Sequence, residues 1–485
     1  MKIKKIVVSL FAAGMMAAPL AHATNGMNME GYGPVATGMG GASYAYDNGA
    51  AAMVNNPTTI GLMADGESRL DVAFGKLGPT VKAQAGAAVA DSTGTAYYMP
   101  AAGYVQKRGN FAYGIGMFAQ GGMGTDFGST SFMTPPGSGL ENRSEVGVGR
   151  VAVPLAYDVS NELKIGGSVD FVWASMDLQM AMGGAQFMDM LPTVMNPLAT
   201  QAGGTLGGGM VTALGAVMPM MNPANPLNWG YFNFSNKDRW MGMARSSGFA
   251  GKLGMTYKVS PQLTLGAVYH SKTTLGDMTA DGASLSFNAN IDTGLAGGGA
   301  ASGIFAPMTI PVTGKISVVN FQWPETYGFG LAYQASDELM VAADYKRIGW
   351  ANVMKNFQMA FTADAAQANP MAAAFAGTTL NATMYQNWKD QDVFMFGLAY
   401  KATHDLTLRG GLQTSNNPVP DAYLNPLFPA IVKDQYTLGA GYAFNKVSSV
   451  DGSLTIVPSV SATGGSGVTS SMSQVNYQVM YTHRF

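Results

Sequence analysis

The fold of this chain is decided by a stretch that reads YDVSNELKI over residues 157–165, because its pattern returns three more times. In each copy a Tyr is followed at fixed spacings by Ser or Thr, by Leu and by one more apolar residue. The four copies are Tyr157–Ser160–Leu163–Ile165, Tyr257–Ser260–Leu263–Leu265, Tyr333–Ser336–Leu339–Val341 and Tyr400–Thr403–Leu406–Leu408. Each copy predicts a strand that ends on an aromatic residue, a tight polar turn and a strand that runs back. Repeated hairpins of this kind, with an apolar residue at every second position, are typical of a transmembrane β-barrel.

The strands that follow these turns have one apolar face and one polar face. The apolar sets are Leu163, Ile165, Val169, Phe171 and Trp173, then Leu263, Leu265, Ala267 and Tyr269, and then Leu406, Leu408, Gly410 and Leu412. Between them stand Lys164, Ser168 and Asp170, then Thr264, Gly266, Val268 and His270, and then Thr407, Arg409, Gly411 and Gln413. A period of two residues puts each set on its own face of a strand. Because lipid requires the apolar face, the polar set is predicted to line the lumen.

The number of turns predicts the number of strands. The four repeats and two further short turns, at Lys107–Asn110 and near Asn445-Lys446, make six short turns. Seven long Gly-, Pro- and Asn-rich connections lie between them, near residues 78–94, 122–142, 181–240, 276–315, 358–389, 414–433 and 460–472. Thirteen connections predict an all-β, fourteen-stranded antiparallel barrel over residues 67–485. Its short turns would face the periplasm and its long loops the outside of the cell.

The two ends of the chain predict its compartment. Three Lys residues precede a short apolar run and the small-x-small cleavage site Ala21-His22-Ala23, so residues 1–23 are predicted to be a secretory signal peptide. From Val475 apolar residues alternate up to the terminal Phe485, as in the strand that outer-membrane barrels present to their assembly machinery. Together these features predict a multi-pass protein of the Gram-negative outer membrane.

The composition excludes several classes of protein. Charged residues make up 12% of the chain, against about 25% in ordinary soluble domains. Loss of the three Lys of the signal changes the formal net charge from −2 to −5, which is not the balance of a nucleic-acid-binding protein. The absence of Cys excludes disulfides and thiolate metal sites, and no cluster of other ligands predicts a metal or a cofactor.

The interior of so wide a barrel must be plugged by another part of the chain or it becomes a water channel, since strand side chains cannot fill it. The segment before the first strand, residues 24–66, is dense in Gly and Ala and shows neither strand alternation nor a long amphipathic helix. Small residues let backbone approach backbone in a confined space. This segment is therefore predicted to be a hatch, or plug, in the lumen.

Three short runs in this segment resemble the N-terminal hatch of the FadL family. They are Thr37–Ser43, Asp47–Gly49 and Asn55–Thr58, and the family's Asn-Pro-Ala motif falls on Asn56, Pro57 and Thr58, with Thr in place of Ala. The family comprises outer-membrane transporters of long-chain fatty acids and, in relatives, of aromatic hydrocarbons. The resemblance covers the whole mature chain, from the hatch through the strand count and the long third outer loop to the terminal Phe. The hatch and gating residues that it implies are Gly38, Gly40, Gly41, Asp47, Asn48, Asn56, Pro57 and Thr58.

The resemblance also implies a route for the substrate. A hydrophobic molecule would adhere to a groove on the outer loops and then enter a pocket in the lumen. A rearrangement of the hatch would open a path, either along the barrel or sideways through the wall at a kinked strand. The flow would be diffusive, without an energy source or a cofactor, and the protein would be a monomer.

The connection over residues 181–240 is unusually apolar and rich in Met. Loops that face water are usually polar, and Met-rich surfaces adapt to varied apolar ligands. The residues expected to form a substrate groove are Phe187, Met188, Leu191, Met195, Leu214, Met218, Trp229 and Phe234. In the alternative interpretation these side chains only pack loop against loop in a cap.

Cations on the lumen face are candidates for holding the head group of a fatty carboxylate. They are Lys164, Lys252, Lys346 and Arg409. Alternatively, these charges belong to pairs that only satisfy each other. Long-chain fatty acids are the expected cargo, because they are the cargo of the best-known member of the family; aromatic or alkane hydrocarbons are the alternative.

Other classes of function find less support. No nucleophile motif accompanies His270, so an enzyme is not expected. The alternatives from other classes are a general porin and an adhesin or phage receptor. A steady large ion current through the protein would favour the porin. The expected partners are a hydrophobic small molecule, outer-membrane lipids with lipopolysaccharide, and the barrel assembly machinery, with no nucleic acid.

Overall fold

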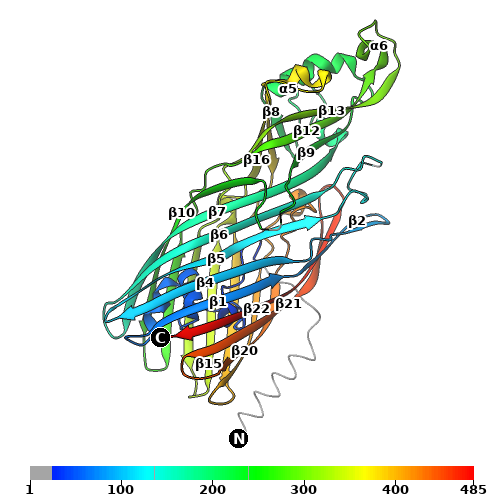
Figure 1. Ribbon diagram of the computed structural model, residues 1–485. Helices are drawn as coiled ribbons and strands as arrows, with labels where there is room; N and C mark the ends of the chain where they lie inside the picture. The colour runs from blue at the N-terminus through cyan, green and yellow to red at the C-terminus, as the bar shows by residue number, and fades with distance from the viewer. Residues whose placement is uncertain (1–24, 136, 239) are drawn as a thin grey trace.

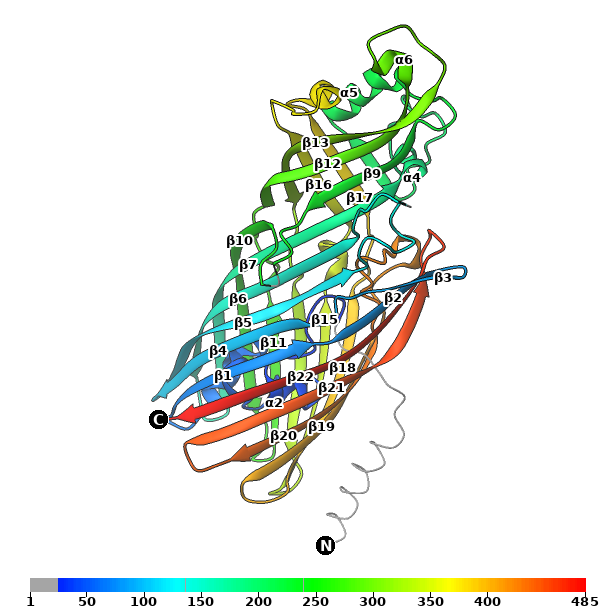
Figure 2. The same ribbon diagram turned by 45° about the vertical axis from the view of Figure 1, so that its right-hand side comes forward.

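The strands of the molecule form one antiparallel sheet. The computed structural model describes residues 25–485 apart from 136 and 239, so the predicted signal peptide, 1–23, lies outside the described residues. In the described part of the chain the sheet has 22 strands, and Figures 1 and 2 show it as a tall barrel with tilted strands. In these residues no helix is long and apolar enough to span a bilayer.

One set of strands pairs in a closed circuit, each with the next, and the last strand, β22, pairs with the first, β1. In order around the wall they are β1 (Ser68–Leu77), β4 (Tyr97–Arg108), β5 (Phe111–Asp126), β6 (Arg143–Asp158), β7 (Leu163–Gly183), β10 (Ala244–Lys258), β11 (Leu263–His270), β14 (Thr326–Gln334), β15 (Leu339–Ile348), β18 (Gln391–Lys401), β19 (Leu406–Ser415), β20 (Asp434–Ala443), β21 (Ser448–Thr463) and β22 (Thr469–Arg484). A closed circuit has no edge strand, which a sheet in lipid requires. The predicted closed, antiparallel, all-β barrel is therefore confirmed.

Further strands lie in segments that the sequence pattern assigned to loops. They are β2 (Pro79–Ala85), β3 (Ala88–Asp91), β8 (Gly204–Gly207), β9 (Leu227–Phe234), β12 (Met278–Asp292), β13 (Phe305–Val319), β16 (Asn356–Ala363) and β17 (Thr379–Tyr385). The total of 22 strands in the described residues therefore exceeds the expected fourteen. The expectation took the Gly, Pro and Asn residues of these segments as loop signals, but β12 buries Leu285 and Phe287 at alternate positions and pairs with β9 and β13.

The strands β8, β9, β12, β13, β16 and β17 extend the wall beyond one end of the barrel, as Figure 1 shows at the top. We call this part the extracellular extension. Its helices are α4 (Gly184–Asp189), α5 (Gly209–Val217), η3 (Met218–Met220), α6 (Thr293–Ala296) and η5 (Pro370–Phe375). Two further short helices, η4 (Trp350–Asn352) and η6 (Asp421–Tyr423), lie in other connections.

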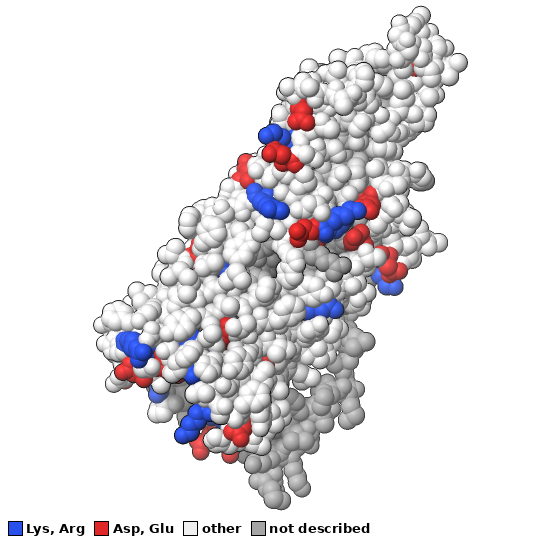
Figure 3. Space-filling model, viewed as in Figure 1, with Lys and Arg blue, Asp and Glu red and all other residues white. Residues whose placement is uncertain are grey.

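The two faces of the wall follow the predicted alternation. In β7, Ile165, Val169 and Phe171 are exposed, whereas Ser168 and Asp170 are buried. Leu265 and the row Val475, Tyr477, Val479 and Tyr481 are exposed in the same way. Charged side chains on the face shown in Figure 3 gather at its lower end and at a level in the upper half, with few between. An uncharged belt between two charged levels is what a membrane-spanning surface requires.

Candidate functional site

The N-terminal segment, described from residue 25, lies inside the barrel. It contains the short helices α2 (Pro34–Thr37), η1 (Gly49–Ala51), α3 (Ala52–Asn55) and η2 (Pro57–Leu62), which Figures 1 and 2 show in blue within the wall. Between residues 25 and 61 every residue is buried except Gly33, which is half-buried, and Asp47, which is exposed. The segment therefore occupies the lumen at the level of β1, β15 and β19.

Carboxylates on the wall hold the backbone of this segment. The Oδ2 atom of Asp344 accepts hydrogen bonds from the amides of Ser43 at 2.6 Å and Tyr44 at 3.0 Å. The Oδ2 atom of Asp71 accepts one from the amide of Ala50 at 2.6 Å. These contacts fix the segment on opposite sides of the lumen.

Glycines let the segment touch the wall backbone to backbone. A Cβ on Gly40, whose φ is +67°, would lie 2.6 Å from the carbonyl oxygen of Phe396 and 2.7 Å from that of Leu412. On the wall, a Cβ on Gly397 or Gly411 would overlap with the backbone of Met39 or Gly40. The predicted hatch residue Gly40 is thus placed where only glycine fits.

The other predicted hatch residues stabilise bends within the segment or bind the wall. Asn56 accepts a hydrogen bond from the amide of Thr58 at 3.2 Å and donates one to the carbonyl of Tyr44 at 2.8 Å, and Pro57 begins η2. Asn48 donates to the carbonyl of Ser43 at 2.9 Å. The remaining three lie as follows: Gly38 lies against Gly439, Gly41 against the carbonyl of Glu30, and Asp47 pairs with Arg69 at 2.9 Å. The structure therefore brings all eight residues together, while their gating role stays a prediction.

Each of the four predicted head-group cations has a protein partner. Lys164 pairs with Asp158 at 2.6 Å, and Arg409 pairs with Asp451 at 2.8 Å. Lys252 pairs with Asp170, which also binds Arg150. Lys346 donates to the carbonyl oxygens of Met29 and Glu30 at 3.4 and 3.3 Å. These contacts favour the alternative in which the charges satisfy each other or hold the segment.

The predicted groove residues lie in the extracellular extension. Phe187, Leu191, Leu214 and Phe234 belong to one buried apolar core, and Met188, Met195 and Met218 pack against it. Trp229 is buried but lies outside this core. Phe187 and Phe287 pack edge to face with ring centroids 5.4 Å apart. In this state seven of the eight residues pack in or against the core of a cap, and the contact of all eight with substrate stays a prediction.

The wall has a gap between β4 and β5. The two strands pair only from Ala102 opposite Met117 to Arg108 opposite Phe111. Beyond that point β4 pairs with β1 and not with β5, down to Tyr97. Over the same stretch β5 pairs with β6, up to Asp126, and is bridged to the N-terminal segment at Gly121 and Asn28.

A bulge in β5 accompanies the gap. The register of β5 shifts between Ala119 and Gly121, which leaves Gln120 as an extra residue. The side-chain amide of Gln120 donates to Asn28 at 2.9 Å, and the amide of Gly122 donates to the carbonyl of Met27 at 3.0 Å. The N-terminal segment thus takes hydrogen-bonding positions on β5 that a neighbouring strand would otherwise fill.

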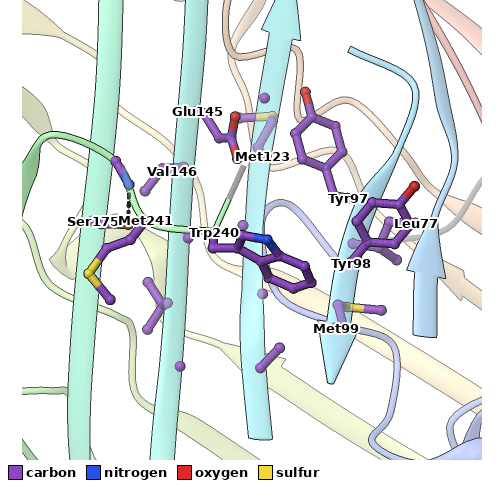
Figure 4. A pocket seen from close by; sticks show the side chains of 18 of the residues that line it. Leu77, Tyr97, Tyr98, Met99, Met123, Glu145, Val146, Ser175, Trp240 and Met241 are labelled. Atoms are coloured by element: carbon purple, nitrogen blue, oxygen red, sulfur yellow. Dashed lines mark hydrogen bonds between the residues drawn. The ribbon is translucent and has the colours of Figure 1, made fainter. Parts of the chain in front are cut away.

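A cavity of about 330 Å³ crosses the wall at this gap (Figure 4). Leu77, Met99, Phe118 and Met472 line it from the lumen side, and Tyr98, Met117, Trp173 and Trp240 line it from the outer side. Apolar and aromatic walls of this kind are typical of sites for small hydrophobic molecules, and the volume lies at the lower end of their range.

A second, smaller cavity of about 20 Å³ lies deeper in the lumen. Its apolar lining includes Met27, Met123, Val146, Met176, Leu178, Met180, Phe321, Met354, Phe357, Met384 and Phe428. Met123 and Val146 also line the cavity at the gap, so the two spaces are neighbours. We call these two cavities, together with the shared Met123 and Val146, the apolar passage.

The sequence analysis did not predict where this passage lies, although the glycines of β5 could have indicated it. Gly114, Gly116, Gly121, Gly122 and Gly124 crowd one stretch of β5, and isolated glycines in a strand mark bulges or close backbone approach. The expectation of a kinked strand came from the resemblance alone and named no residue.

Comparisons with known proteins agree with this architecture. The sequence model of the family described as outer membrane protein transport protein (OMPP1/FadL/TodX) matches residues 10–484. The structure of the toluene transporter TodX of Pseudomonas putida superposes with a TM-score of 0.76 and 28% identity, over 94% of this chain and 99% of that chain. The toluene transporter TbuX of Ralstonia pickettii gives a TM-score of 0.71 and 30% identity, over 94% and 99%.

Two further matches give less information, one because its sequence identity is low and one because it covers a small part of the chain. A FadL homologue of Pseudomonas aeruginosa, 15% identical over 94% of this chain and 99% of its own, shares the fold with a TM-score of 0.64. An uncharacterized protein in the phosphoenolpyruvate carboxykinase gene 5′ region of Chlorobium limicola is 45% identical over 67 residues. That match covers 14% of this chain and 33% of that protein, so this chain spans about a third of the length of the relative.

Proposed function

We propose, from the premise that this chain belongs to the OMPP1/FadL/TodX family of outer-membrane transport proteins, that it admits small aromatic hydrocarbons to the cell by diffusion. The protein is a multi-pass β-barrel of the outer membrane and a channel for hydrophobic compounds. Its aromatic cargo and its sideways exit are the proposal.

Two observations support an aromatic cargo over the fatty acid that the sequence first suggested. The similar structures TodX and TbuX, which cover nearly the whole chain, are toluene transporters. In addition, the four lumen cations that would hold a carboxylate head group already have protein partners. A cargo without a head group needs no free cation, whereas a buried carboxylate without a partner is costly.

The apolar passage is the single observation that carries the proposed route. A hydrocarbon would cross the extracellular extension, pass the second, smaller cavity and reach the gap between β4 and β5. The N-terminal segment would block the direct way to the periplasm and act as the hatch, with its contacts to Gln120 and Gly122 tying its position to the gap. The cargo would then leave sideways into the membrane, driven by consumption inside the cell.

The proposal also assigns the strands that cross the membrane. They are the fourteen of the closed circuit, from β1 to β22, whereas the strands of the extracellular extension stand outside. This assignment is supported by the apolar outer rows of the circuit strands and by the charged levels above and below them.

A comparison of cargo classes tests the function. In cells that lack the protein and in cells complemented with it, the initial uptake rates of toluene, oleate and hexadecane are measured with radiolabelled compounds. The proposal expects a rate for toluene that is at least several-fold higher in complemented cells, with little change for oleate. Uptake of oleate without uptake of toluene would overturn the aromatic cargo, and a steady large ion current through the purified protein would favour a porin.

A further inference from the structure

A loop on the outer surface, residues 235–243 apart from 239, is tied at both ends to one carboxylate. Asp177 of β7 accepts hydrogen bonds from Ser235 Oγ at 2.8 Å and from the amide of Lys237 at 3.1 Å. It also accepts one from the amide of Met243 at 2.6 Å, where the loop returns to β10. Arg143 of β6 neutralises the same carboxylate at 2.7 Å. We call this loop the outer loop.

The tip of the outer loop reaches across the wall to the far side of the gap. Its Trp240 ring lies 6.0 Å from the ring of Tyr98, centroid to centroid. Tyr98 belongs to β4, while Asp177 belongs to β7, so the loop passes over β6, β5 and the gap between β5 and β4. Figure 4 shows Trp240 over the edge of β5, on the side that faces Tyr98.

The loop lies on the outer side of the wall. Tyr98 stacks on Phe74, a residue of the exposed apolar row of β1, with ring centroids 5.6 Å apart. Trp240 and Met241 line the cavity that crosses the wall, yet Trp240 is 64% exposed. Trp240 therefore stands at the outer mouth of that cavity.

One side chain of the loop and one of β7 hold the tip in place. Asp238 accepts a hydrogen bond from the amide of Trp240 at 2.7 Å, and Ser175 accepts one from the amide of Gly242 at 3.1 Å (Figure 4). Beneath the tip, Gly147 has no atom within 4 Å of an added Cβ, which leaves open space on the outer face of β6. The tip is thus fixed at its base and has room to move at Trp240.

We propose that Trp240, held by the outer loop, is the lid on the lipid side of the passage and sets the width of the cargo that can leave through it. This inference rests on the proposed function and deepens it. An aromatic ring of the cargo would exchange contacts with the rings of Trp240 and Tyr98 as it leaves. Molecules of one ring would pass with a small displacement of the tip, and wider molecules would be held back.

Cross-linking tests whether the lid must move. Because the chain contains no Cys, the double variant Tyr98→Cys/Trp240→Cys carries only the two introduced thiols. A short dithiol-reactive cross-linker with a cleavable disulfide spacer is expected to join them and to lower toluene uptake at least tenfold, and reductant is expected to restore it. The matched control is Phe171→Cys/Phe249→Cys, an exposed pair with ring centroids 5.9 Å apart, away from the gap. Its cross-linking is expected to leave uptake unchanged.

A single substitution tests the selectivity. Trp240→Ala is expected to raise naphthalene uptake several-fold while changing toluene uptake by less than twofold. Phe249→Ala, which removes an outer aromatic residue of similar exposure, is expected to change neither.

The possible results distinguish failure of the proposed lid from failure of the proposed function. If no cross-link forms between positions 98 and 240, or if it forms and toluene uptake is unaffected, the lid is overturned while the channel stands. Equal naphthalene uptake by Trp240→Ala and the wild type overturns the selectivity role. If the wild-type protein carries neither toluene nor naphthalene, the proposed function fails, and the lid fails with it.

Discussion

Glu30 is a carboxylic acid enclosed between the N-terminal segment and the wall, and only 1% of its surface is exposed. Thr455 donates a hydrogen bond to its Oε1 atom at 3.2 Å, while Oε2 has no partner among the described residues. Burial raises the pKa of Glu30 to about 7, because the charged form loses its hydration. Lys346, whose ammonium lies 3.3 Å from the Glu30 carbonyl oxygen, opposes this rise only in part.

The raised pKa makes docking of the segment depend on pH. Between about pH 4.5 and about pH 7 the docked segment binds more protons than a released one, so docking is strongest below this window and weakens as pH rises through it. Amides of residues 25–33 are expected to be better protected from hydrogen exchange at about pH 5 than at about pH 8, after correction for intrinsic rates. Glu30→Gln should reduce the difference. The same pH dependence in this variant as in the wild type would contradict the role of Glu30.

The loss of unfolding free energy caused by a charge on the lipid-facing surface depends on how deep the residue lies in the bilayer. Leu253, which is 66% exposed in the middle part of β10, is expected to lose ~2–4 kcal/mol of unfolding free energy on change to Arg. Leu265 lies two residues after the start of β11, near the turn, so its change to Arg should cost about 1 kcal/mol or less. Urea unfolding in lipid vesicles measures both. Equal costs would mean that the membrane does not sit around the barrel as assigned.

At this scale the faces of the strands were predictable and the ion pairs were not. A period of two residues puts Asp170 and Ser168 inside and Phe171 outside, whatever the neighbouring strands do. The partner of Lys252, by contrast, is Asp170, 82 residues earlier in the chain, and only the arrangement of β7 beside β10 brings the two together.

At the scale of elements, the bulge in β5 lies where the pairing of β5 with β4 has ended. Deletion of Gln120 removes the extra residue, so we expect β5 to continue its pairing with β4 and to narrow the gap. Toluene uptake should fall at least tenfold, while the variant still migrates as a folded, heat-modifiable barrel. Gln120→Ala, which keeps the bulge and removes only the side-chain hydrogen bonds, is the matched control and should retain most uptake. Full uptake by the deletion variant would contradict an exit at this gap.

Among the elements, the short turns could be predicted from the sequence and the strands of the extracellular extension could not. Short turns follow from local residue patterns, and the four Tyr-containing repeats all lie at tight turns between circuit strands. The extracellular extension has no such signal, because strands such as β12 and β13 contain residues that usually mark loops, among them Gly282, Pro307 and Pro311. Their pairing with each other and with β9 is a property of the assembled sheet.

At the scale of the whole molecule, a barrel with this circumference must be filled or it conducts ions. The N-terminal segment lies in the bore, held by Asp344 and Asp71. Deletion of residues 24–63 is expected to give a folded barrel that leaks small polar solutes and shows large steady conductance in planar bilayers, where the wild-type protein is nearly silent. A deletion variant that stays tight would mean that other parts of the chain close the bore.

The central claim is that hydrophobic cargo leaves through the wall between β4 and β5 and does not travel the length of the barrel. Its most direct test is the position of para-bromotoluene in crystals of the wild-type protein, read from the anomalous signal of bromine. We predict bromine in the cavity bounded by Met99, Phe118 and Trp240, with a second site beside Met123. Bromine found only below the N-terminal segment, at the periplasmic end of the lumen, would contradict the account.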